Sequence, residues 1–474
     1  MSLRILLINP PHLQKILYNR EGRCQQKVSS FSYLMVPMSL IYVASLLREN
    51  GFAVRVIDYM AQKNAHIKQV LADVRAYSAD LIFTSIVFPT CYNDFQIIQH
   101  IRNATGAHLS AIGLMGSLLP EESLSNSTLD SVIRGEPEET SLELAIALRD
   151  KRELAGIRGI SCKIDGEIIH NPPRCFIKNL DALPFPARDL IDQAAYTLPI
   201  NRRPYTFIIP SRGCTKSCIF CEVRLYYGNQ LRLRSIPNVM EEIREIVHKT
   251  DITDIEIFSD NLTLNRNFVV DFCNGILENG LKIRWMANSR VDTVDKELLQ
   301  LMRKAGCTGL AFGIESCNQT VLDNIKKGTT LENIKNAISW AKQEGIKVLA
   351  HMIIGLPGDT KETIKENVTI LNRLNPDFVG YYFAIPYPNT EFYELAVRNN
   401  WLKEKRWDRF ELDSCIVETS SLSRQELKKA RLYCYWKFFL RLATVKKIAK
   451  EVRSFKEAID ILKSLFYILK EWVF

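Results

Sequence analysis

Short apolar strands alternate with longer amphipathic segments in two separate stretches of the chain, and this alternation restricts the fold more than any other feature. Strands joined by crossover helices form a parallel sheet that is covered on both faces. The first 150 residues therefore predict a doubly wound, Rossmann-like α/β domain, whose ligand would lie beyond the carboxyl ends of the strands. The strands expected in this domain are Arg4–Ile8, Ala53–Ile57, Asp80–Thr84, His108–Ile112 and Ser131–Ile133.

The second alternation covers residues 201–389 and consists of six strand–helix units. Six consecutive units predict a partial (β/α)6 barrel, an open relative of the TIM barrel, with its active site at the carboxyl ends of the strands. The strands expected here are Tyr205–Ile209, Asp254–Phe258, Lys282–Ala287, Thr308–Gly313, Lys347–Ile354 and Asp377–Phe383.

Two further regions complete the organisation of the chain. Residues 151–200 contain an expected hairpin, Ser161–Ile169, that turns at Asp165-Gly166 and is followed by several prolines, so we expect a linker there. Residues 390–474 combine Tyr, Trp and Phe with Lys and Arg at helical spacing. We therefore expect a basic, aromatic helical region at the C-terminal end.

The formal net charge of +9 comes almost entirely from this C-terminal end. Residues 424–474 hold 13 Lys and Arg against 5 Asp and Glu, without a nucleic-acid-binding motif, so we expect no nucleic-acid partner. One interpretation is that these helices pack on the barrel with their charges in solvent. The other is that they form a membrane-surface helix that presents a lipid-like substrate.

Cysteine usage and the apolar runs indicate a cytoplasmic protein. The 12 cysteines are scattered apart from one cluster, unlike those of a secreted disulfide scaffold. The apolar runs are too short or too charged to span a bilayer, and Met1–Asn9 lacks the features of a signal peptide. We expect a cytoplasmic location, with peripheral contact to the inner face of the membrane if the C-terminal region binds lipid.

The cysteine cluster follows directly on the first barrel strand, with Cys214, Cys218 and Cys221 in one loop. Thiolates at this spacing bind zinc or an iron–sulfur cluster. Structural zinc requires four closed ligands, and no other Cys or His lies between residues 200 and 247. The spacing favours an iron–sulfur cluster with one open iron, and zinc is the alternative.

This CxxxCxxC motif, with Phe220 before its third cysteine, resembles the motif of the radical S-adenosylmethionine (SAM) superfamily. The resemblance implies that Cys214, Cys218 and Cys221 hold a [4Fe–4S] cluster and that Phe220 lies near the adenine of SAM. In this superfamily the open iron chelates the amino and carboxylate groups of SAM. An electron, here from an external donor such as flavodoxin or ferredoxin, then cleaves SAM to methionine and a 5′-deoxyadenosyl radical.

Later barrel segments resemble the SAM-binding segments of the same superfamily. The segment after the second strand would lie near the amino group, the third would approach the cofactor, the fourth would meet the ribose and methionyl part, and the fifth-strand glycine turn would pack on adenine. Ordinary alternatives are a helix cap for Asp260 and Asn261, an ion pair for Arg290 and a turn for Gly355. The residues assigned to SAM in this way are Asp260, Asn261, Arg290, Glu315, Ser316 and Gly355.

The N-terminal domain resembles the cobalamin-binding domain of B12-dependent radical SAM proteins, which include methyltransferases and the anaerobic magnesium-protoporphyrin monomethyl ester cyclase. The resemblance rests on Asn9-Pro10-Pro11, on Gly51-Phe52 and on Arg134-Gly135-Glu136, the start of a motif that reads RGEGE in the family. The loops that it assigns to the corrin carry Pro10, Ser85, Gly113, Gly116, Ser117, Gly135 and Glu136.

Two features depart from the wider cobalamin pattern. The Asp-x-His-x-x-Gly motif, whose His ligates cobalt in methionine synthase-like proteins, is absent, as is general in this group. The loop after the fourth strand usually carries Gly-Gly and here reads Gly113-Leu-Met-Gly116-Ser117. The alternative to functional cobalamin binding is a doubly wound domain that docks on the barrel with its ligand site lost.

Together the resemblances imply cobalamin-dependent methylation of an unactivated carbon, with one SAM cleaved to the radical and a second remethylating the cobalt. A cyclase-type oxidation without methyl transfer is the second hypothesis, and a non-catalytic iron–sulfur module is the third. The substrate, a small or lipid-like molecule, and any catalytic acid or base are not assigned. Cys317 and His351 are weaker candidates for lining the active site.

Overall fold

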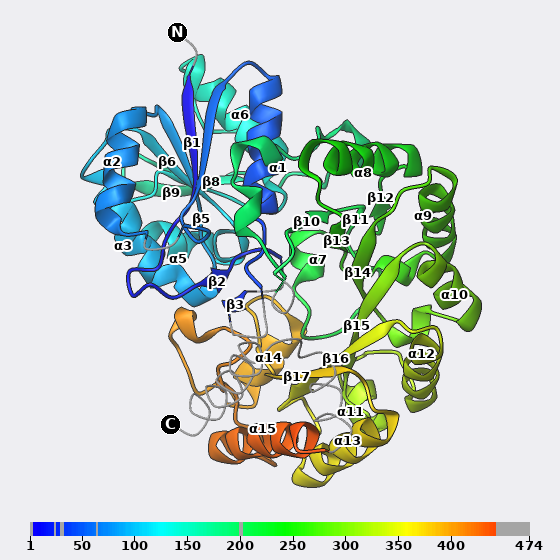
Figure 1. Ribbon diagram of the computed structural model, residues 1–474. Helices are drawn as coiled ribbons and strands as arrows, with labels where there is room; N and C mark the ends of the chain where they lie inside the picture. Colours follow the sequence, from blue (N-terminus) through cyan, green and yellow to red (C-terminus); the bar gives the residue numbers. More distant parts are fainter. Residues whose placement is uncertain (1–2, 23–24, 29–32, 63–64, 199–201, 442–474) are drawn as a thin grey trace.

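The computed structural model describes residues 3–22, 25–28, 33–62, 65–198 and 202–441 and shows an N-terminal α/β domain beside a partial barrel (Figure 1). The N-terminal sheet has seven strands in the order β4-β1-β5-β6-β7-β8-β9. The first five strands in this order are parallel, and the last two are antiparallel. The strands are β1 (Arg4–Asn9), β4 (Ala53–Asp58), β5 (Leu81–Ser85), β6 (His108–Ile112), β7 (Ser131–Ile133), β8 (Ile160–Ile164) and β9 (Glu167–His170).

The buried residues of β1 explain why helices cover both faces of this sheet. Ile5 and Leu7 belong to the core shared with α1 and α6, whereas Leu6 and Ile8 belong to the core shared with α2 and α3. The strand order reverses between β1 and β5, so their carboxyl ends form the crevice expected of a doubly wound domain. The helices are α1 (Met38–Glu49), α2 (Ile67–Tyr77), α3 (Cys91–Arg102), α4 (Leu114–Leu118), α5 (Pro120–Ser125) and α6 (Pro137–Arg149).

The hairpin expected in the linker is part of the N-terminal sheet. β8 pairs antiparallel with β7 and with β9, so the sheet continues to His170 and the connection to the barrel begins after it. That connection then packs on α1, where Ser45 Oγ donates to the carbonyl oxygen of Phe185 at 2.6 Å. The packing holds the start of the barrel against the N-terminal domain.

The second sheet has six parallel strands in chain order, β10-β13-β14-β15-β16-β17, and confirms the partial barrel. The strands are β10 (Tyr205–Ile208), β13 (Asp254–Ile257), β14 (Arg284–Ser289), β15 (Cys307–Glu315), β16 (Lys347–Ile354) and β17 (Phe378–Phe383). The helices between them are α8 (Ile236–Thr250), α9 (Arg266–Glu278), α10 (Lys296–Lys304), α11 (Gln319–Asn324), α12 (Leu331–Gln343) and α13 (Lys361–Leu374).

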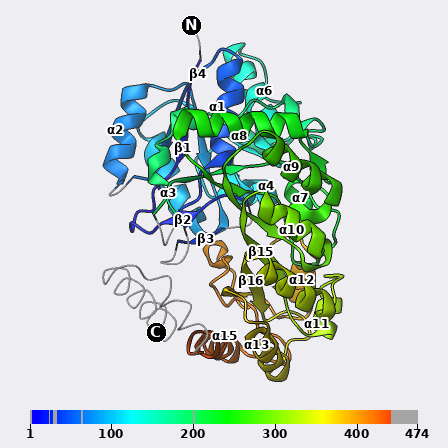
Figure 2. The same cartoon turned by 45° about the vertical axis from the view of Figure 1, so that its right-hand side comes forward.

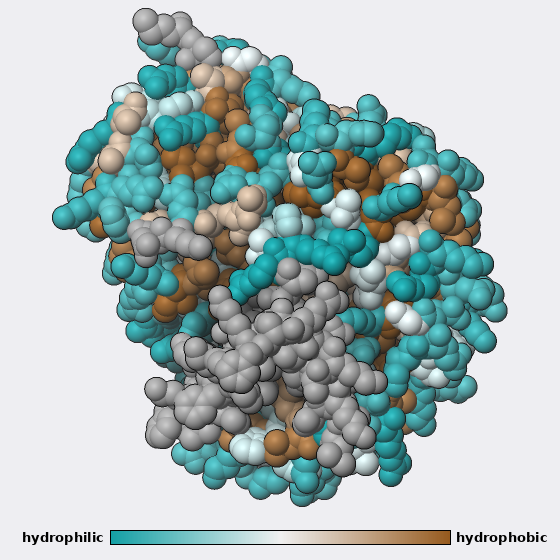
Figure 3. All heavy atoms as spheres, viewed as in Figure 1, coloured by the Kyte–Doolittle hydropathy of each residue, from teal (hydrophilic) through white to brown (hydrophobic). Residues whose placement is uncertain are grey.

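The barrel helices cover only the outer face of this sheet (Figure 2). On β14, Trp285 and Ala287 are buried on the helix side, whereas the alternating residues Met286 and Asn288 are half-buried. The inner face of the strand therefore stays partly accessible. Polar side chains cover most of the face seen in Figure 3, with apolar side chains visible over the N-terminal sheet and between the barrel helices.

The C-terminal region begins with α14 (Glu391–Arg398) and continues to α15 (Arg424–Phe439), which packs on α13 and β17. The helical pattern expected over residues 442–474 lies outside the described residues. None of the helices in the described ranges combines the length and the apolar character needed to cross a membrane.

Candidate active site at the domain boundary

The three cysteines lie in a loop that starts at β11 (Ser211–Arg212), just after β10. β11 pairs with β12 (Arg232–Leu233), and the chain passes between them through the short helix α7 (Val223–Tyr226). Gly213 has φ +86°, and a Cβ there would clash with the carbonyl oxygen of Gln230. The tight turn brings all three thiols to the loop surface, each half-buried.

The described residues contain no group of three or more His, Cys, Asp or Glu gathered closely enough for one metal ion. Each thiolate of a [4Fe–4S] cluster binds a different iron, so its sulfurs stand farther apart than those around a single ion. Half-buried thiols with a cationic neighbour fit such a cluster. Arg290 is that neighbour, since its Nη1 lies 3.7 Å from Sγ of Cys218.

An ion pair with Asp292 holds Arg290 in place. Its Nε donates to Oδ1 of Asp292 at 2.8 Å, and Oδ2 of Asp292 accepts from Nζ of Lys216 at 3.1 Å. Lys216 belongs to the cysteine loop. The third-strand segment thus reaches the cysteine loop, and its guanidinium lies against Cys218, an expected cluster ligand.

The segment after β13 also meets the cysteine loop. Asp260 Oδ2 accepts a hydrogen bond from the backbone N–H of Gly213 at 3.1 Å, so its carboxylate helps to shape the turn before Cys214. Asn261 is buried, and its Nδ2 has no hydrogen-bond partner among the described residues. Buried amide donors are normally paired, so this donor is suited to a bound ligand.

The segment at the end of β15 adopts a turn that few side chains tolerate. Glu315 has φ +64°, in the left-handed region, and its carboxylate pairs with Nζ of Lys327 at 2.7 Å inside the protein. Ser316 Oγ donates to Oδ1 of Asn367 at 3.3 Å, which also accepts from the backbone N–H of Cys317 at 2.7 Å. This rare backbone at a strand end is typical of functional sites.

The other barrel residues that were expected near SAM or the active site lie either at strand ends or in the core. Gly355 has φ +92° and its N–H donates to Asp359, whose pKa burial raises to about 6. Phe220 is half-buried against the core. His351 is half-buried on β16, 5.4 Å from the ring of Tyr382. Burial raises the pKa of Cys317 to about 12, so its thiol stays protonated.

A cavity lies between the N-terminal sheet and the residues that directly follow Cys221. Its walls come from both domains, and they include Ser85 and Gly113 at the carboxyl ends of β5 and β6 and Asp260 from the barrel. Its lining residues are Arg20, Glu21, Gly22, Gln25, Ser39, Ser85, Ile112, Gly113, Leu114, Glu222, Val223, Tyr226, Tyr227 and Asp260.

The remaining cobalamin candidates shape the loops around this cavity. Gly113 has φ +119°, and a Cβ there would clash with the carbonyl oxygen of Ile86, so the position requires glycine. Ser117 Oγ donates to the carbonyl oxygen of Gly113 at 2.9 Å and accepts from the N–H of Gly135 at 3.0 Å. Gly116 packs on Ile86 behind the loop.

Two more candidates stand apart from the cavity wall. The carbonyl oxygen of Pro10 accepts from Nη2 of Arg20 at 3.3 Å. The carboxylate of Glu136 lies against Arg212 at 3.0 Å and against Arg232 at 2.8 Å. The resemblance assigned Glu136 to the corrin, but its carboxylate is already paired with these two arginines.

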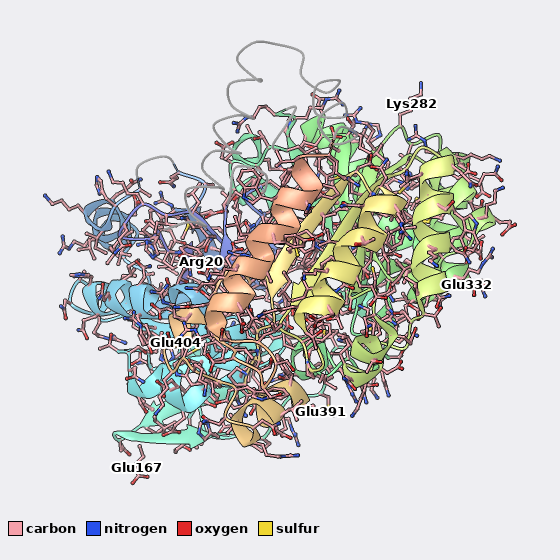
Figure 4. All side chains as sticks on the ribbon, turned by 90° about the horizontal axis from the view of Figure 1, so that it is seen from below. Arg20, Glu167, Lys282, Glu332, Glu391 and Glu404 are labelled. Atoms are coloured by element: carbon pink, nitrogen blue, oxygen red, sulfur yellow. The ribbon has the colours of Figure 1, made fainter. Side chains whose placement is uncertain are left out.

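Sequence reasoning missed the segment at β2 (Tyr18–Asn19) and β3 (Gln26–Lys27), which supplies part of the cavity wall. Arg20 is buried in an ion pair with Asp94 at 2.7 Å, and Figure 4 shows it inside the molecule, whereas Glu167, Lys282 and Glu332 lie at its periphery. Glu21 accepts from Ser39 Oγ at 2.9 Å, and burial raises its pKa to about 8. No motif marks this irregular segment.

Two family models match the chain. The model of the radical SAM superfamily matches residues 208–370, and the model of the B12 binding domain matches residues 28–145. The first match contains the cysteine loop and the strands β13 to β16. The second contains the strands β4 to β7 of the N-terminal sheet.

Curated relatives match over most of the chain. An uncharacterized methyltransferase of Pyrococcus horikoshii is 30% identical over 472 residues, which are 98% of this chain and 99% of the relative. The anaerobic magnesium-protoporphyrin IX monomethyl ester cyclase of Rubrivivax gelatinosus is 26% identical, over 86% of this chain and 74% of the cyclase. The hopanoid C-3 methylase of Methylococcus capsulatus is 24% identical, over 81% of this chain and 72% of the methylase.

Two solved structures share the fold. The cobalamin-dependent SAM radical enzyme OxsB, with aqua-cobalamin bound, has a TM-score of 0.75 at 19% identity and covers 99% of this chain and 71% of its own. The second is the radical SAM methyltransferase TsrM from Kitasatospora setae, with cobalamin and a [4Fe–4S] cluster bound. It has a TM-score of 0.69 at 20% identity and covers 85% of this chain and 76% of its own. The order of the two domains is thus that of these folds.

Proposed function

Because the chain belongs to the family of B12-dependent radical SAM enzymes, we propose that it transfers a methyl group from SAM, through cobalamin, to an unactivated carbon of its substrate. The observation that carries this proposal is the cavity, whose walls combine the carboxyl-end loops of the N-terminal sheet with the cysteine loop. The expected corrin loops and the residues that directly follow Cys221 therefore line one space. When bound, the cluster supplies the electron that cleaves SAM, and cobalamin supplies the methyl group.

The chain's own residues have three tasks in this proposal. Cys214, Cys218 and Cys221 would bind three irons and leave the fourth for SAM, and Arg290 places a positive charge beside Cys218. Asn261 offers its unpaired amide N–H groups to a ligand. Backbone loops at Ser85 and Gly113 would hold the corrin, because no His or other strong cobalt ligand is among the residues that line the cavity.

Glu21 has a separate role in the cavity wall. Glu21 is 7% exposed and lines the cavity, and its pKa of about 8 keeps a proton on this carboxyl at neutral pH. A neutral carboxyl beside two cofactors avoids an uncompensated buried charge and remains able to donate a hydrogen bond.

The test of the proposed function follows a labelled methyl group of SAM in the reconstituted enzyme with Ti(III) citrate and hydroxocobalamin. Label in methylcobalamin, with one S-adenosylhomocysteine released per methyl, supports methyl transfer without requiring a known substrate. Cys218→Ala is the control for cluster-dependent cleavage to 5′-deoxyadenosine. Deoxyadenosine without any S-adenosylhomocysteine would overturn methylation.

A cyclase-type oxidation is the second candidate, because the Rubrivivax gelatinosus relative carries that activity in its name. It shares SAM cleavage but consumes no methyl group. The same assay separates the two, since only methylation yields S-adenosylhomocysteine. A chain that retains an intact cluster with strong reductant and yet leaves SAM uncleaved would instead support the non-catalytic module.

The proposal includes partners and a location. A cytosolic flavodoxin or ferredoxin would deliver the electron to the cluster, and the substrate would be a small or lipid-like molecule that enters the barrel. Helix α15 exposes Tyr433 and Trp436 beside Lys437, and Leu440, which caps its C-terminal end, is 65% exposed. Aromatic and basic residues on one exposed face suit the surface of an anionic membrane, so we include peripheral membrane contact.

A further inference from the structure

Four charged side chains form a buried group at the boundary between the two domains. The function proposed above does not use them. Arg212 pairs with Glu138 at 2.5 Å and with Glu136 at 3.0 Å, and Arg232 pairs with Glu136 at 2.8 Å. Each of these side chains is at most 10% exposed. We call Glu136, Glu138, Arg212 and Arg232 the boundary quartet.

The two halves of the boundary quartet belong to the two cofactor-binding regions. Glu136 precedes α6 and Glu138 lies in its first turn, directly after β7 of the N-terminal sheet. Arg212 lies on β11, two residues before Cys214, and Arg232 lies on the paired strand β12. The quartet therefore connects the RGEPE segment of one domain to the base of the cysteine loop of the other.

Aromatic rings and backbone groups complete this connection. The guanidinium of Arg212 lies 5.5 Å from the ring centre of Tyr42 on α1 and 5.5 Å from that of Tyr227 behind the cysteine loop. Nη2 of Arg232 donates to the carbonyl oxygen of Tyr227 at 2.8 Å, and Glu136 accepts from the N–H of Ile177 at 2.8 Å. Forked charge-assisted bonds fix direction as well as distance.

The energetics argue for a geometric role. The quartet is balanced, with two positive and two negative charges, so no net charge is buried. A buried ion pair contributes little net stability compared with apolar residues of the same volume, because desolvation offsets the attraction. Its specific contribution is a defined arrangement of the elements that it joins, which here are α6 and the cysteine loop.

We propose that the boundary quartet positions the cysteine loop relative to the N-terminal domain and so sets the alignment of cluster-bound SAM with cobalamin. The inference rests on the proposed function. The step that depends on it moves CH3 from the SAM sulfonium to cob(I)alamin. Bound cobalamin would supply the electron pair that accepts CH3, and the S–C pair would stay on sulfur to give S-adenosylhomocysteine. Misalignment of about 1 Å is enough to slow a reaction about 10²-fold.

Glu138→Gln and Glu242→Gln form a matched pair of test variants. Glu242 on α8 is also fully buried, and it pairs with Arg188 Nη2 at 2.5 Å and with Arg234. Both substitutions remove one buried carboxylate that is paired with arginine. Only Glu138 joins α6 to the cysteine loop, so the two variants share a loss of stability and differ in their effect on alignment.

A double variant, Arg212→Met with Glu138→Leu, distinguishes a loss of alignment from a loss of activity caused by unfolding. It removes one charge of each sign and leaves the Arg232–Glu136 pair intact, so the buried charge stays balanced. Replacement of a buried ion pair by apolar residues is often neutral or stabilising. The double variant therefore retains the fold while it removes the directional bonds that Arg212, at the base of the cysteine loop, makes to the N-terminal domain.

The decisive activity measurement is a ratio taken with each variant under Ti(III) citrate, hydroxocobalamin and labelled SAM. Methylcobalamin formation requires alignment of both cofactors, whereas abortive cleavage to 5′-deoxyadenosine requires the cluster alone. We expect the ratio of methylcobalamin to 5′-deoxyadenosine to fall about tenfold or more in Glu138→Gln and in the double variant, and to stay at the wild-type value in Glu242→Gln. An unchanged ratio in the double variant would overturn the proposal.

Hydrogen exchange of the apoprotein gives an independent measurement. We expect amides 213–222 to exchange about tenfold faster in the double variant, with β14 and β15 unchanged. Equal protection of this loop in wild type and double variant would also overturn the proposal. If the wild type itself forms no methylcobalamin, the proposed function fails, and hydrogen exchange alone then decides whether the quartet holds the loop.

Discussion

Arg290 directly follows β14 and Cys218 lies in the loop after β11, and the guanidinium Nη1 lies 3.7 Å from the sulfur. A positive hydrogen-bond donor beside a cluster ligand stabilises the reduced, more negative cluster, because hydrogen bonds to the sulfurs tune the reduction potential. In the proposed function, this contact would link the third-strand segment to the redox chemistry of the cluster.

Arg290→Gln is therefore expected to lower the midpoint potential of the reconstituted cluster, by about 60 mV if one tenfold equilibrium effect is lost. Arg290→Lys keeps the charge and should lower the potential less. Redox titration followed by EPR measures both. A potential that is the same in all three proteins would contradict a role of Arg290 at the cluster.

Gly113→Ala is expected to destabilise the apoprotein by about 1 to 3 kcal/mol or more, because the position combines φ +119° with a Cβ clash against Ile86. Gly51→Ala is the matched control, since Gly51 also has positive φ, +81°, but has open space around its Cβ. Urea unfolding measures the difference. Gly113→Ala should also retain less hydroxocobalamin after desalting, and equal retention would argue against a corrin at this loop.

Glu21 predicts a pH dependence of stability. Its pKa rises from 4.5 unfolded to about 8 in the folded chain because of burial, so the folded state holds the proton more tightly. The stability that this proton supports is complete below about pH 4.5 and is lost as the pH rises toward 8.

Glu21→Gln removes this dependence. The unfolding free energy of the variant minus that of the wild type should therefore rise between pH 5 and pH 8, by on the order of 1 to 3 kcal/mol. Glu256 and Asp359, with pKa values of about 7 and about 6, act in the same direction in both proteins and cancel in the difference. A constant difference across this range would show that Glu21 is charged throughout.

Trp436→Glu tests the proposed membrane contact of α15. We expect its binding to vesicles of phosphatidylglycerol and phosphatidylcholine to weaken on the order of tenfold in co-sedimentation, because an exposed aromatic side chain is replaced by a negative charge. Leu277→Glu, at a similarly exposed position on α9, is the control and should bind as the wild type does. Equal binding of both variants would exclude α15 as the contact.

The periodic features of the sequence predicted the fold well. The strand His108–Ile112 and the strand Lys347–Ile354 have the predicted bounds, because regular alternation and flanking turn residues define buried strands sharply. The hairpin turning at Asp165-Gly166 was also predicted, but its place in the N-terminal sheet was not. Local turn chemistry fixes a hairpin, whereas the strand on which it pairs depends on tertiary packing.

Motifs pointed to the cysteine loop and to the Gly113 loop, whereas sequence reasoning missed the irregular segment of the cavity wall. Gly113 and the residues that directly follow Cys221 line one cavity. Glu136 was assigned to the corrin by motif position, whereas its carboxylate pairs with Arg212 from a segment 76 residues away. Arg20 and Glu21 lie in an irregular segment without periodicity, so only the folded chain reveals their burial.

The most direct test of the account is the cobalamin content of the anaerobically reconstituted protein. Titration with hydroxocobalamin, followed by desalting, would give the amount of corrin retained per iron–sulfur cluster. We expect one corrin for each cluster in the wild type, because the corrin loops and the residues that directly follow Cys221 line the same cavity. A full cluster with no retained corrin would contradict the methyl-transfer function, although radical SAM chemistry would remain.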